Sequence, residues 1–299
     1  MIAKAGRVGG FGKEGRPLYR RAGGLPFDVD SAGVALLGGL ADLWAKVIAF
    51  LREWGPQLPY LLEGARSTLI LTTLAVGLGI VFGTVIGLCR VIPSEPIRRN
   101  EGIVRVLRAL ILRFVRWAAG AYVDFFRGTP LLVQLYIVFF GLPMLFGSLS
   151  FDAFTAGVIA LSLNSGAYVG EIVRAGIQSI DRGQMEAALA TGLTYVQAMW
   201  HVVLPQAMRR MVPPLGNEFI ALLKDSSLVA VISLEELFRR SQILVTRTFK
   251  PFEVYLMTAV IYLVMTKAIS LLVNWIERRS SARRRTSKRV ETTTQTASA

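Results

Sequence analysis

The sequence predicts an all-α integral membrane protein, and three observations support this fold class. First, 53% of the 299 residues are hydrophobic and only 18% are charged, with a mean hydropathy of +0.49. Second, several uncharged runs are long enough to cross a bilayer. Third, basic residues are concentrated between and after these runs, as in the cytoplasmic loops of membrane proteins. A soluble enzyme does not fit this composition.

The charge balance and the rare residues narrow the chemistry. Lys and Arg total 34 against 20 Asp and Glu, a formal charge of +14, which fits either a nucleic-acid or a membrane partner. Because the basic residues adjoin apolar runs, we expect anionic lipid headgroups and no nucleic acid. The single Cys89 and single His201 offer no metal cluster and are interpreted as structural, so no metal site is expected.

The first 56 residues fall into two parts. Residues 1–30 contain Gly-Gly pairs and scattered basic residues, and they predict a flexible basic extension. In residues 31–56, apolar side chains recur at helical spacing opposite polar ones, which predicts an amphipathic helix. This helix either lies in the membrane interface or forms an extra, sixth span.

Residues 57–277 form the predicted transmembrane domain with five core spans. Residues 67–89 carry no formal charge and would rise about 34 Å as a helix. Residues 128–151 and 153–170 are further candidate spans, and 252–276 is another although it is interrupted by Lys267. Residues 211–234 complete the five, although this segment includes Glu218, Lys224 and Asp225.

The distribution of arginine sets the expected orientation. Residues 90–127 contain eight arginines, Arg90 and Arg127 included, whereas 147–152 contains no basic residue, so the first loop is expected inside. Counting onward puts residues 176–210 and the basic polar tail 278–299 inside as well. Four basic residues contradict this topology because it assigns them to the outside: Arg239, Arg240, Arg247 and Lys250.

Within the first loop, four arginines lie in one sector of a helical wheel, which predicts a helix in the membrane interface: Arg105, Arg108, Arg113 and Arg116.

Loop 179–205 is unusual for a loop between spans because it predicts two capped helices. Asp181 is expected to cap the start of the first helix, and Gly192 to end it in the left-handed conformation. Thr194 and Gln197 are expected to form the capping box of the second helix, which Pro205 is expected to end. The two helices share an apolar face: Met185, Ala188, Leu189, Gly192, Tyr195, Val196, Met199 and Val203. This face either packs on the chain's own helices or is covered by a partner protein.

This loop resembles the EAA motif of ABC importer permeases. The residues that carry the resemblance are Glu186, Ala187, Ala188, Gly192, Leu204 and Pro205, with Val202 where the motif usually has Ile. Four further segments resemble the polar amino-acid subfamily: Arg127-Gly128-Thr129-Pro130, 164–171, 213–218 and 224–228. Asp124 and Ser226 depart mildly from its pattern. The resemblance covers roughly residues 62–279.

The resemblance implies an ABC type I importer-like transmembrane domain in a bacterial cytoplasmic (inner) membrane. It implies as partners a second permease subunit, identical or homologous, two ABC ATPase subunits and a soluble substrate-binding protein. ATP and Mg²⁺ belong to the ATPase, and this chain is expected to bind no cofactor. Its only Gly-Lys pair, Gly12-Lys13, lacks the rest of a P-loop. The EAA helices would dock on the ATPase.

Acidic residues at membrane depth suggest a substrate pathway, because an intramembrane carboxylate usually faces a cavity or a partner. Glu218 and Asp225 are seven residues apart on one helical face, and Glu171 ends the third span. They could accept an ammonium group, with Asn164 and Gln134 as neutral hydrogen-bonding groups. The alternative is internal pairing, of Glu171 with Arg174 and of Asp225 with Lys224 or Arg127.

Two further patterns are interpreted as structural. The first pattern predicts either a helix start, with Thr129 as its cap, or a kink in a longer helix: Arg127, Gly128, Thr129 and Pro130. Gly79, Gly83 and Gly87 form a small-residue stripe that predicts close helix packing within the chain.

Two functions from other classes remain as alternatives. A stand-alone secondary transporter or channel would use the intramembrane acids with an ion gradient, but the spans show no obvious internal repeat. A membrane enzyme would need a nucleophile, a base and an orienting group, and no such set is recognised.

Overall fold

The computed structural model describes residues 42, 44–50, 52–92, 102–147 and 150–297, with side chains as far as Arg279. The chain divides into two units, 1–56 and 57–299. In the first unit, the described residues from Asp42 to Trp54 are helical, in line with the predicted amphipathic helix. The predicted extension 1–30 lies outside the described residues.

In the second unit every regular element of the described residues is helical. The elements are α2 (Leu58–Val91), α3 (Ile103–Gly128), α4 (Leu131–Tyr136), α5 (Leu142–Phe146), α6 (Ala153–Gln178), α7 (Arg182–Ala190), α8 (Tyr195–Ala198), α9 (Leu204–Asp225), α10 (Leu237–Thr248) and α11 (Pro251–Ala297). Short π- or 3₁₀-helical turns connect them at η1 (Gly55–Gln57), η2 (Ile137–Gly141), η3 (Met199–Val203) and η4 (Ser226–Ile232).

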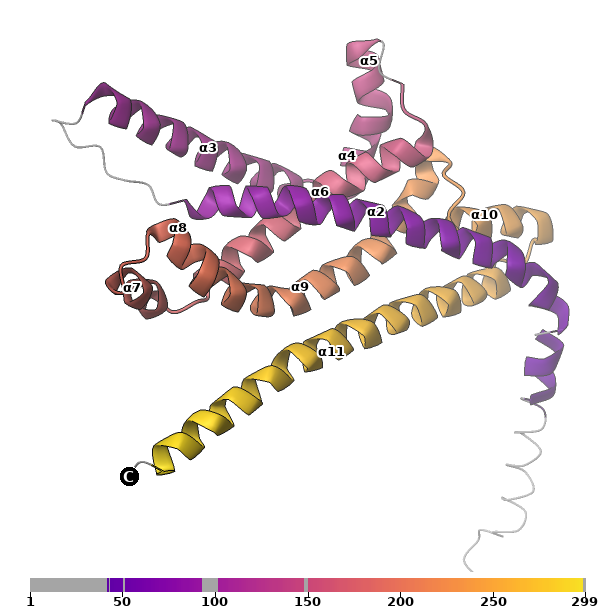
Figure 1. Cartoon of the computed structure of the whole chain (residues 1–299). Coiled ribbons are helices and arrows are strands. Elements are labelled where there is room, and N and C mark those ends of the chain that lie inside the picture. The colour runs from indigo at the N-terminus through magenta and orange to yellow at the C-terminus, as the bar shows by residue number, and fades with distance from the viewer. Residues whose placement is uncertain (1–41, 43, 51, 93–101, 148–149, 298–299) are drawn as a thin grey trace, which may run out of the picture. The chain divides into compact units, whose positions relative to one another are not determined.

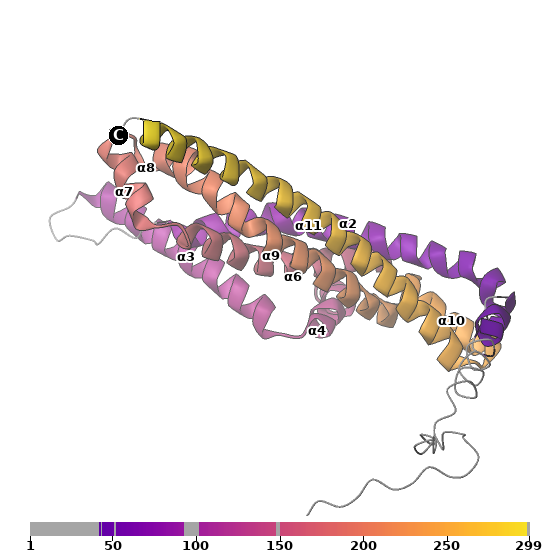
Figure 2. The ribbon, with the colours of Figure 1, turned by 90° about the horizontal axis from the view of Figure 1, so that it is seen from below.

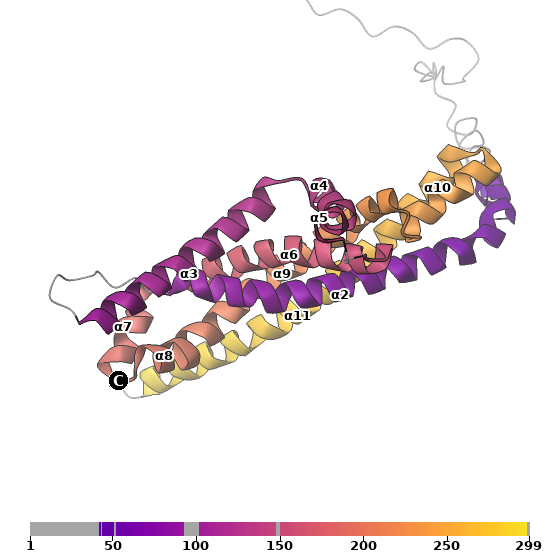
Figure 3. The ribbon, with the colours of Figure 1, turned by 90° about the horizontal axis from the view of Figure 1, so that it is seen from above.

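The long helices of this unit run side by side with alternating direction (Figure 1). The end of α2, helices α7 and α8, and the C-terminal end of α11 lie together at one end of the unit (Figure 2). Helix α10 lies at the opposite end, as Figure 3 also shows. The end of the first predicted span, the EAA loop and the C-terminal tail therefore lie at one end, as the predicted orientation requires.

The packing of α2 on α6 depends on the glycine stripe. A Cβ atom on Gly83 would lie 2.6 Å from the carbonyl oxygen of Gly166, and one on Gly87 would lie 2.6 Å from Cβ of Val173. A Cβ on Gly79 would meet Ser165 at 2.8 Å. The stripe therefore allows close helix packing within the chain, as predicted.

Hydropathy and length identify three helices that can cross a membrane, within Trp44–Val91, Ala153–Gln178 and Pro251–Arg279, among the described residues. The pair Ile103–Gly128 and Leu131–Phe146 passes the same test together but is bent by 106°. Helix α9 is more polar and packs against α6 and α11. It completes the five core helices.

Two expectations about the second span are corrected. The arginine-rich segment is not a separate interfacial helix: it belongs to the continuous 26-residue α3, whose Ala119 and Val123 are buried in the unit. The predicted span 128–151 is broken at its start, because Pro130 has no N–H and holds Thr129 in extended backbone. Thr129 does not cap α4. Its hydroxyl donates back to the carbonyl of Phe125 at 2.8 Å, so the kink is the better description.

The prediction that Pro205 ends a helix is also wrong. Pro205 lies in the first turn of α9, directly after the π-turn Met199–Val203. Proline has no N–H to donate to the carbonyl four residues earlier. The preceding π-turn already departs from the α-helical hydrogen-bonding pattern, because the Leu204 N–H donates to the carbonyl oxygen of Met199, five residues earlier. The helical backbone thus continues from the loop directly into α9.

Candidate functional site

The loop between α6 and α9 is held in shape by local caps. The Asp181 carboxylate accepts from the Gly183 N–H at 2.6 Å and starts α7. Thr194 and Gln197 form the predicted capping box, with the Thr194 N–H donating to Oε1 of Gln197 at 2.9 Å. Gly192 has φ +89°, where a side chain would be strained. These three local predictions are confirmed.

The predicted apolar face of this loop divides into two sides. The inner side, Met185, Met199 and Val203, packs on a cluster formed by α6 and α9, and Ala188 is buried as well. The outer side remains exposed within this chain: Leu189 41%, Tyr195 38% and Val196 72%. Trp200 on the same loop, which is not one of the predicted residues, is 67% exposed. The loop is therefore fixed to the transmembrane helices and still presents apolar and aromatic groups outward.

The residues of the EAA motif lie on this outward side with two exceptions. Glu186, Ala187, Gly192 and Pro205 are exposed, whereas Ala188 is buried and Leu204 is half-buried. Glu186 forms no ion pair within the part of the chain that the structure describes. The motif thus combines a carboxylate with small residues that permit close approach of another backbone.

Gln134 and Asn164, predicted as neutral pathway groups, lie together in the core. Nδ2 of Asn164 donates to Oε1 of Gln134 at 3.0 Å, and both residues are buried. Nε2 of Gln134 donates to the carbonyl of Phe126 at 2.8 Å and to that of Thr129 at 3.0 Å. Their amides are thereby engaged at the break between α3 and α4.

Glu171 forms the internal pair that the sequence analysis gave as the alternative. Its carboxylate contacts both Arg174, whose Nε donates at 3.0 Å, and Arg90, whose Nη1 lies 2.5 Å away. Arg90 was not anticipated as a partner because it comes from the end of α2. The charge of Glu171 is satisfied inside the chain.

Glu218 and Asp225 differ from Glu171 in that no ion pair within 4.0 Å is found for them in the described residues. Glu218 is half-buried on α9, Asp225 ends the same helix, and the charges of Asp225 and Arg127 both act on Glu218. Arg127 also lies 5.3 Å from the ring centroid of Tyr168. The structure brings these predicted residues into one electrostatic neighbourhood.

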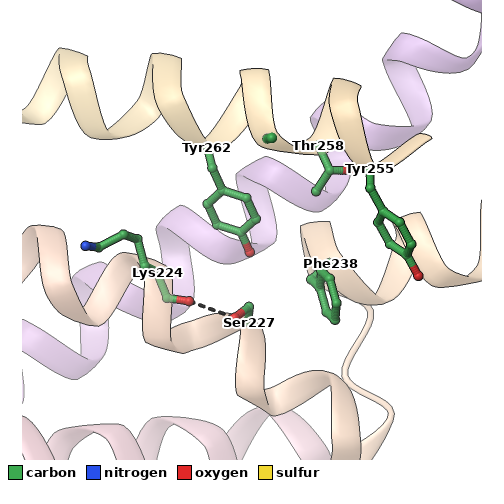
Figure 4. Close-up of a pocket in the computed structure, with 7 residues that line it drawn as sticks. Lys224, Ser227, Phe238, Tyr255, Thr258 and Tyr262 are labelled. Carbon is green, nitrogen blue, oxygen red and sulfur yellow. Dashed lines mark hydrogen bonds between the residues drawn. The ribbon is translucent and has the colours of Figure 1, made fainter. Parts of the chain in front are cut away.

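A cavity of about 610 Å³ lies between the end of α9, α10 and α11 (Figure 4). It is lined by Lys224, Ser227, Phe238, Tyr255, Thr258, Ala259 and Tyr262. This cavity is not predictable from the sequence, because its walls come from segments about 30 residues apart whose contact no local pattern indicates.

Glu236 is a polar residue of the core that was not predicted from the sequence. It is fully buried, and its carboxylate accepts from Thr68 Oγ1 and Tyr262 OH, each at 3.1 Å, and from the Arg239 N–H at 2.8 Å. Burial raises the pKa of Glu236, against the opposing effect of these hydrogen bonds. Its position three residues before Arg239 is typical of a helix cap.

Two of the basic residues that contradict the predicted topology, Arg240 and Arg247, contact residues of α2. Nη1 of Arg240 lies 2.5 Å from Oε2 of Glu63, and its guanidinium carbon lies 4.8 Å from the ring centroid of Tyr60. Arg247 lies 5.6 Å from the same ring. These side chains anchor α10 to α2, which explains why they occur at this end.

Packed apolar helices, polar groups at membrane depth and an outward-facing loop of two capped helices define a multi-pass membrane transport subunit. Residues 106–282 match the family of binding-protein-dependent transport system inner membrane components, and the chain belongs to this family. It is thus a transport permease.

Named relatives and a solved structure agree with this membership. The chain is 37% identical to the glutamine transport system permease protein of Escherichia coli (strain K12), over 75% of this chain and 94% of the relative. It is 39% identical to the arginine transport system permease protein of Bacillus subtilis (strain 168), with the same coverage. A crystal structure of an amino acid ABC transporter with histidines matches with a TM-score of 0.66 and 41% identity, over 77% of this chain and 98% of that one.

Proposed function

We propose that this chain is the permease subunit of an ATP-driven importer of polar amino acids. The observation that carries the proposal is the two-sided loop, whose inner face is packed on α6 and α9 while Val196 and Trp200 are exposed. An exposed apolar patch rimmed by polar residues is typical of a protein interface. The glutamine and arginine relatives support the substrate class.

The partners in this proposal are a second permease, two ABC ATPase subunits and a soluble substrate-binding protein. ATP and Mg²⁺ bind to the ATPase subunits and not to this chain. Helices α7 and α8, together with the C-terminus, face the cytoplasm of the bacterium.

Coupling in this proposal uses the loop as a rigid connector. The outer face docks on the ATPase, where Ala187 and Gly192 permit close approach and Glu186 pairs with a basic group of the partner. Because Met185, Met199 and Val203 are packed on the transmembrane cluster, a displacement of the docked loop moves α6 and α9 with it. Ala188 belongs to this packed side, and the continuous backbone through Leu204 and Pro205 carries the movement into α9.

The substrate pathway in this proposal runs along α9. Glu218 and Asp225 offer carboxylates to the ammonium group of an amino acid, and Lys224 offers its own ammonium to the substrate carboxylate. The cavity beside Lys224 is large enough for such a solute. Asn164, Gln134 and Glu171 form the wall of the pathway and hold its shape, while the Arg127–Pro130 turn sets the direction of α4.

The test is to purify the tagged chain from its native membrane in mild detergent and to identify the subunits that accompany it. We expect a stoichiometric ATPase whose turnover rises when binding protein and glutamine or arginine are added. A chain that purifies alone and transports by itself with an ion gradient would instead establish the secondary carrier.

Variants of the outer face sharpen this test. Val196→Asp and Trp200→Ala should reduce ATPase recovery while the chain still inserts in the membrane. Leu145→Ala is the matched control, because Leu145 is a comparably exposed apolar residue on α5, away from the loop (Figure 1). Equal ATPase recovery in all three variants would refute docking on this face.

A further inference from the structure

Two polar side chains near the start of α9 reach back across the beginning of the EAA loop. Nε2 of Gln206 donates to Oε1 of Gln184 on α7 at 3.1 Å. Nη1 of Arg210 donates to the carbonyl oxygen of Ser179, the residue that follows α6. Because Gln206 and Arg210 are four residues apart, they lie on one face of α9. This face therefore contacts both the end of α6 and the first helix of the loop.

The bond of Arg210 caps the end of α6 from another helix. The last carbonyl groups of a helix have no N–H partner within it, and they carry the negative end of the helix dipole. The N–H of Ser179 donates to the carbonyl oxygen of Ala175 at 2.9 Å, so the backbone of Ser179 continues that of α6. The dipole therefore adds to the charge-assisted hydrogen bond that the guanidinium forms with this carbonyl.

Next to this bond the two helices are in direct apolar contact. Met211 is 2% exposed, and a Cβ atom on Gly176 of α6 would lie 2.5 Å from its Cγ atom. Apolar packing is non-directional, so it tolerates a small shift of one helix along the other. A hydrogen bond weakens steeply when its donor and acceptor are misaligned. Arg210 therefore adds a directional constraint to the contact that Met211 makes.

The bond of Gln206 bypasses the least regular part of the loop. Between Gln184 and Gln206 the chain passes through Gly192, whose φ is +89°, and the π-turn Met199–Val203. A displacement of α7 can be absorbed at either place before it reaches α9, and π-turns often occur at functional sites. The direct Gln184–Gln206 bond joins α7 to α9 across both. The same Nε2 also donates to the carbonyl oxygen of Val202 in the π-turn, at 2.9 Å.

We propose that Gln206 and Arg210 form a polar clamp, which keeps α9 in register with α7 and with the end of α6. The clamp transmits the displacement of the docked loop to α9. This inference rests on the proposed function, because it concerns coupling between the ATPase and the permease. It goes further in giving a role to two residues outside the EAA motif. Both are positioning residues, which act through the loop and not through contact with the substrate.

The experiment uses the complete complex in proteoliposomes, with the binding protein and either glutamine or arginine. The measured quantities are the substrate taken up per ATP hydrolysed and the amount of ATPase subunit bound. Arg210→Met removes the donor but keeps an apolar stem, and it should lower uptake per ATP about fivefold with the bound ATPase unchanged. Arg210→Lys keeps a cationic donor and should restore part of the coupling. Gln206→Met should have a smaller effect, because neutral hydrogen bonds are weaker than charge-assisted ones.

Arg209→Met is the matched control. Arg209 is the neighbouring residue on α9, carries the same charge and is exposed like Arg210, but the hydrogen bond to Ser179 belongs to Arg210. An equal loss in Arg209→Met would show that only the positive charge of this surface matters. Unchanged coupling in Arg210→Met would overturn the proposal, whether or not its thermal midpoint falls, because a role in stability alone does not alter uptake per ATP.

Hydrogen exchange of the α7 amides tests the clamp if Arg210→Met fails to fold. Gln206→Met breaks the bond to Gln184 alone, and α7 should then exchange about fivefold faster, the effect of one neutral hydrogen bond on a local opening equilibrium. Arg209→Met should leave this exchange unchanged. Equal exchange in wild type and Gln206→Met would refute the clamp.

Failure of the proposed function has a different signature. A wild-type complex whose ATPase is not stimulated by binding protein and amino acid would refute the proposed function, and the coupling role of the clamp with it. A stimulated wild type, together with normal uptake per ATP in Arg210→Met and Gln206→Met, would refute the clamp alone.

Discussion

Asn164 on α6 donates its Nδ2 to Oε1 of Gln134 on α4 over 3.0 Å, next to the 106° bend between the α3 and α4–α5 helical segments. Gln134 in turn donates to the carbonyl oxygens of Phe126 and Thr129, which the break at Pro130 leaves without helical partners. Non-helical backbone at membrane depth persists only where such groups are satisfied by protein. One buried amide pair thus stabilises the bend.

Replacing Gln134 by Leu should destabilise the bend. The substitution removes the donor for two carbonyl oxygens and the acceptor for Asn164, and each buried polar group left unpaired costs about 1–3 kcal/mol. We expect a lower thermal midpoint for the purified complex, measured as the loss of monodisperse protein on heating.

The double variant Gln134→Leu with Asn164→Leu is the control for this pair. Because it removes both polar partners, its loss should be smaller than the sum of the two single losses, with a coupling of about 0.5–3 kcal/mol. Additive losses would show that the Asn164–Gln134 bond contributes nothing to the bend.

Adding a methyl group to Gly83 should weaken the packing of α2 on α6. In Gly83→Ala the new Cβ would lie 2.6 Å from the backbone oxygen of Gly166, which cannot move aside like a side chain. Overpacking of this kind costs about 1–3 kcal/mol. The measurement is the thermal midpoint and the yield of folded protein.

Gly77→Ala provides the matched comparison, since nothing lies within 4 Å of a Cβ at Gly77 on the same helix. Alanine has the higher helix propensity, so this variant should be neutral or more stable by up to about 1 kcal/mol. A Gly83→Ala variant as stable as Gly77→Ala would mean that the close approach of the two helices is not present in the membrane.

Local features of this fold were predictable because their causes are local. The Asp181 cap, the Thr194–Gln197 box and the left-handed Gly192 each depend on residues within three positions of one another. The glycine stripe was predictable for the same reason, since its four-residue spacing alone puts the small residues on one face.

Long-range features could not be predicted, because their partners are far apart in the sequence. The pair of Glu171 with Arg90 joins residues 81 positions apart, and Thr68 contacts Glu236 across 168 positions. The apolar face of the EAA loop is intermediate: its periodicity was evident, but only the fold decides that Met199 packs inward and Trp200 remains exposed.

The stability of the protein should depend on the protonation of Glu236. Burial raises its pKa in the folded state above the ordinary value of 4.5, so its contribution to stability is present below that value and is lost as pH rises through the folded-state pKa. Nearby titratable and charged groups are Tyr262, which donates to it, and Arg240, which is paired with Glu63. The wild-type thermal midpoint, compared with that of Glu236→Gln, should fall as pH rises.

The Gln variant mimics the protonated acid, so its midpoint should lack this component of the pH dependence. Glu236→Leu is the contrasting variant: it leaves the Arg239 N–H and the hydroxyls of Thr68 and Tyr262 without their acceptor and should lose about 1–3 kcal/mol at any pH. Parallel pH curves for wild type and Glu236→Gln would show that Glu236 has the same pKa in both states.

Cysteine labelling should decide the orientation of the helices, and the single Cys89 makes this experiment simple. In a Cys89→Ser background, Phe249→Cys places a thiol in the exposed turn before α11, and Arg278→Cys places one at an exposed position of α11 itself. Positive charge is retained on the cytoplasmic side, where the first loop and the tail hold most of the arginines. A membrane-impermeant maleimide should therefore label Phe249→Cys in intact spheroplasts and Arg278→Cys only in inverted vesicles. The reverse pattern would place the EAA loop outside the cell and make docking on a cytoplasmic ATPase impossible.

A third thiol, Ala5→Cys, determines on which side of the membrane the N-terminus lies. It is labelled together with Phe249→Cys if segment 31–56 lies in the interface, and together with Arg278→Cys if that segment crosses the membrane as a sixth span.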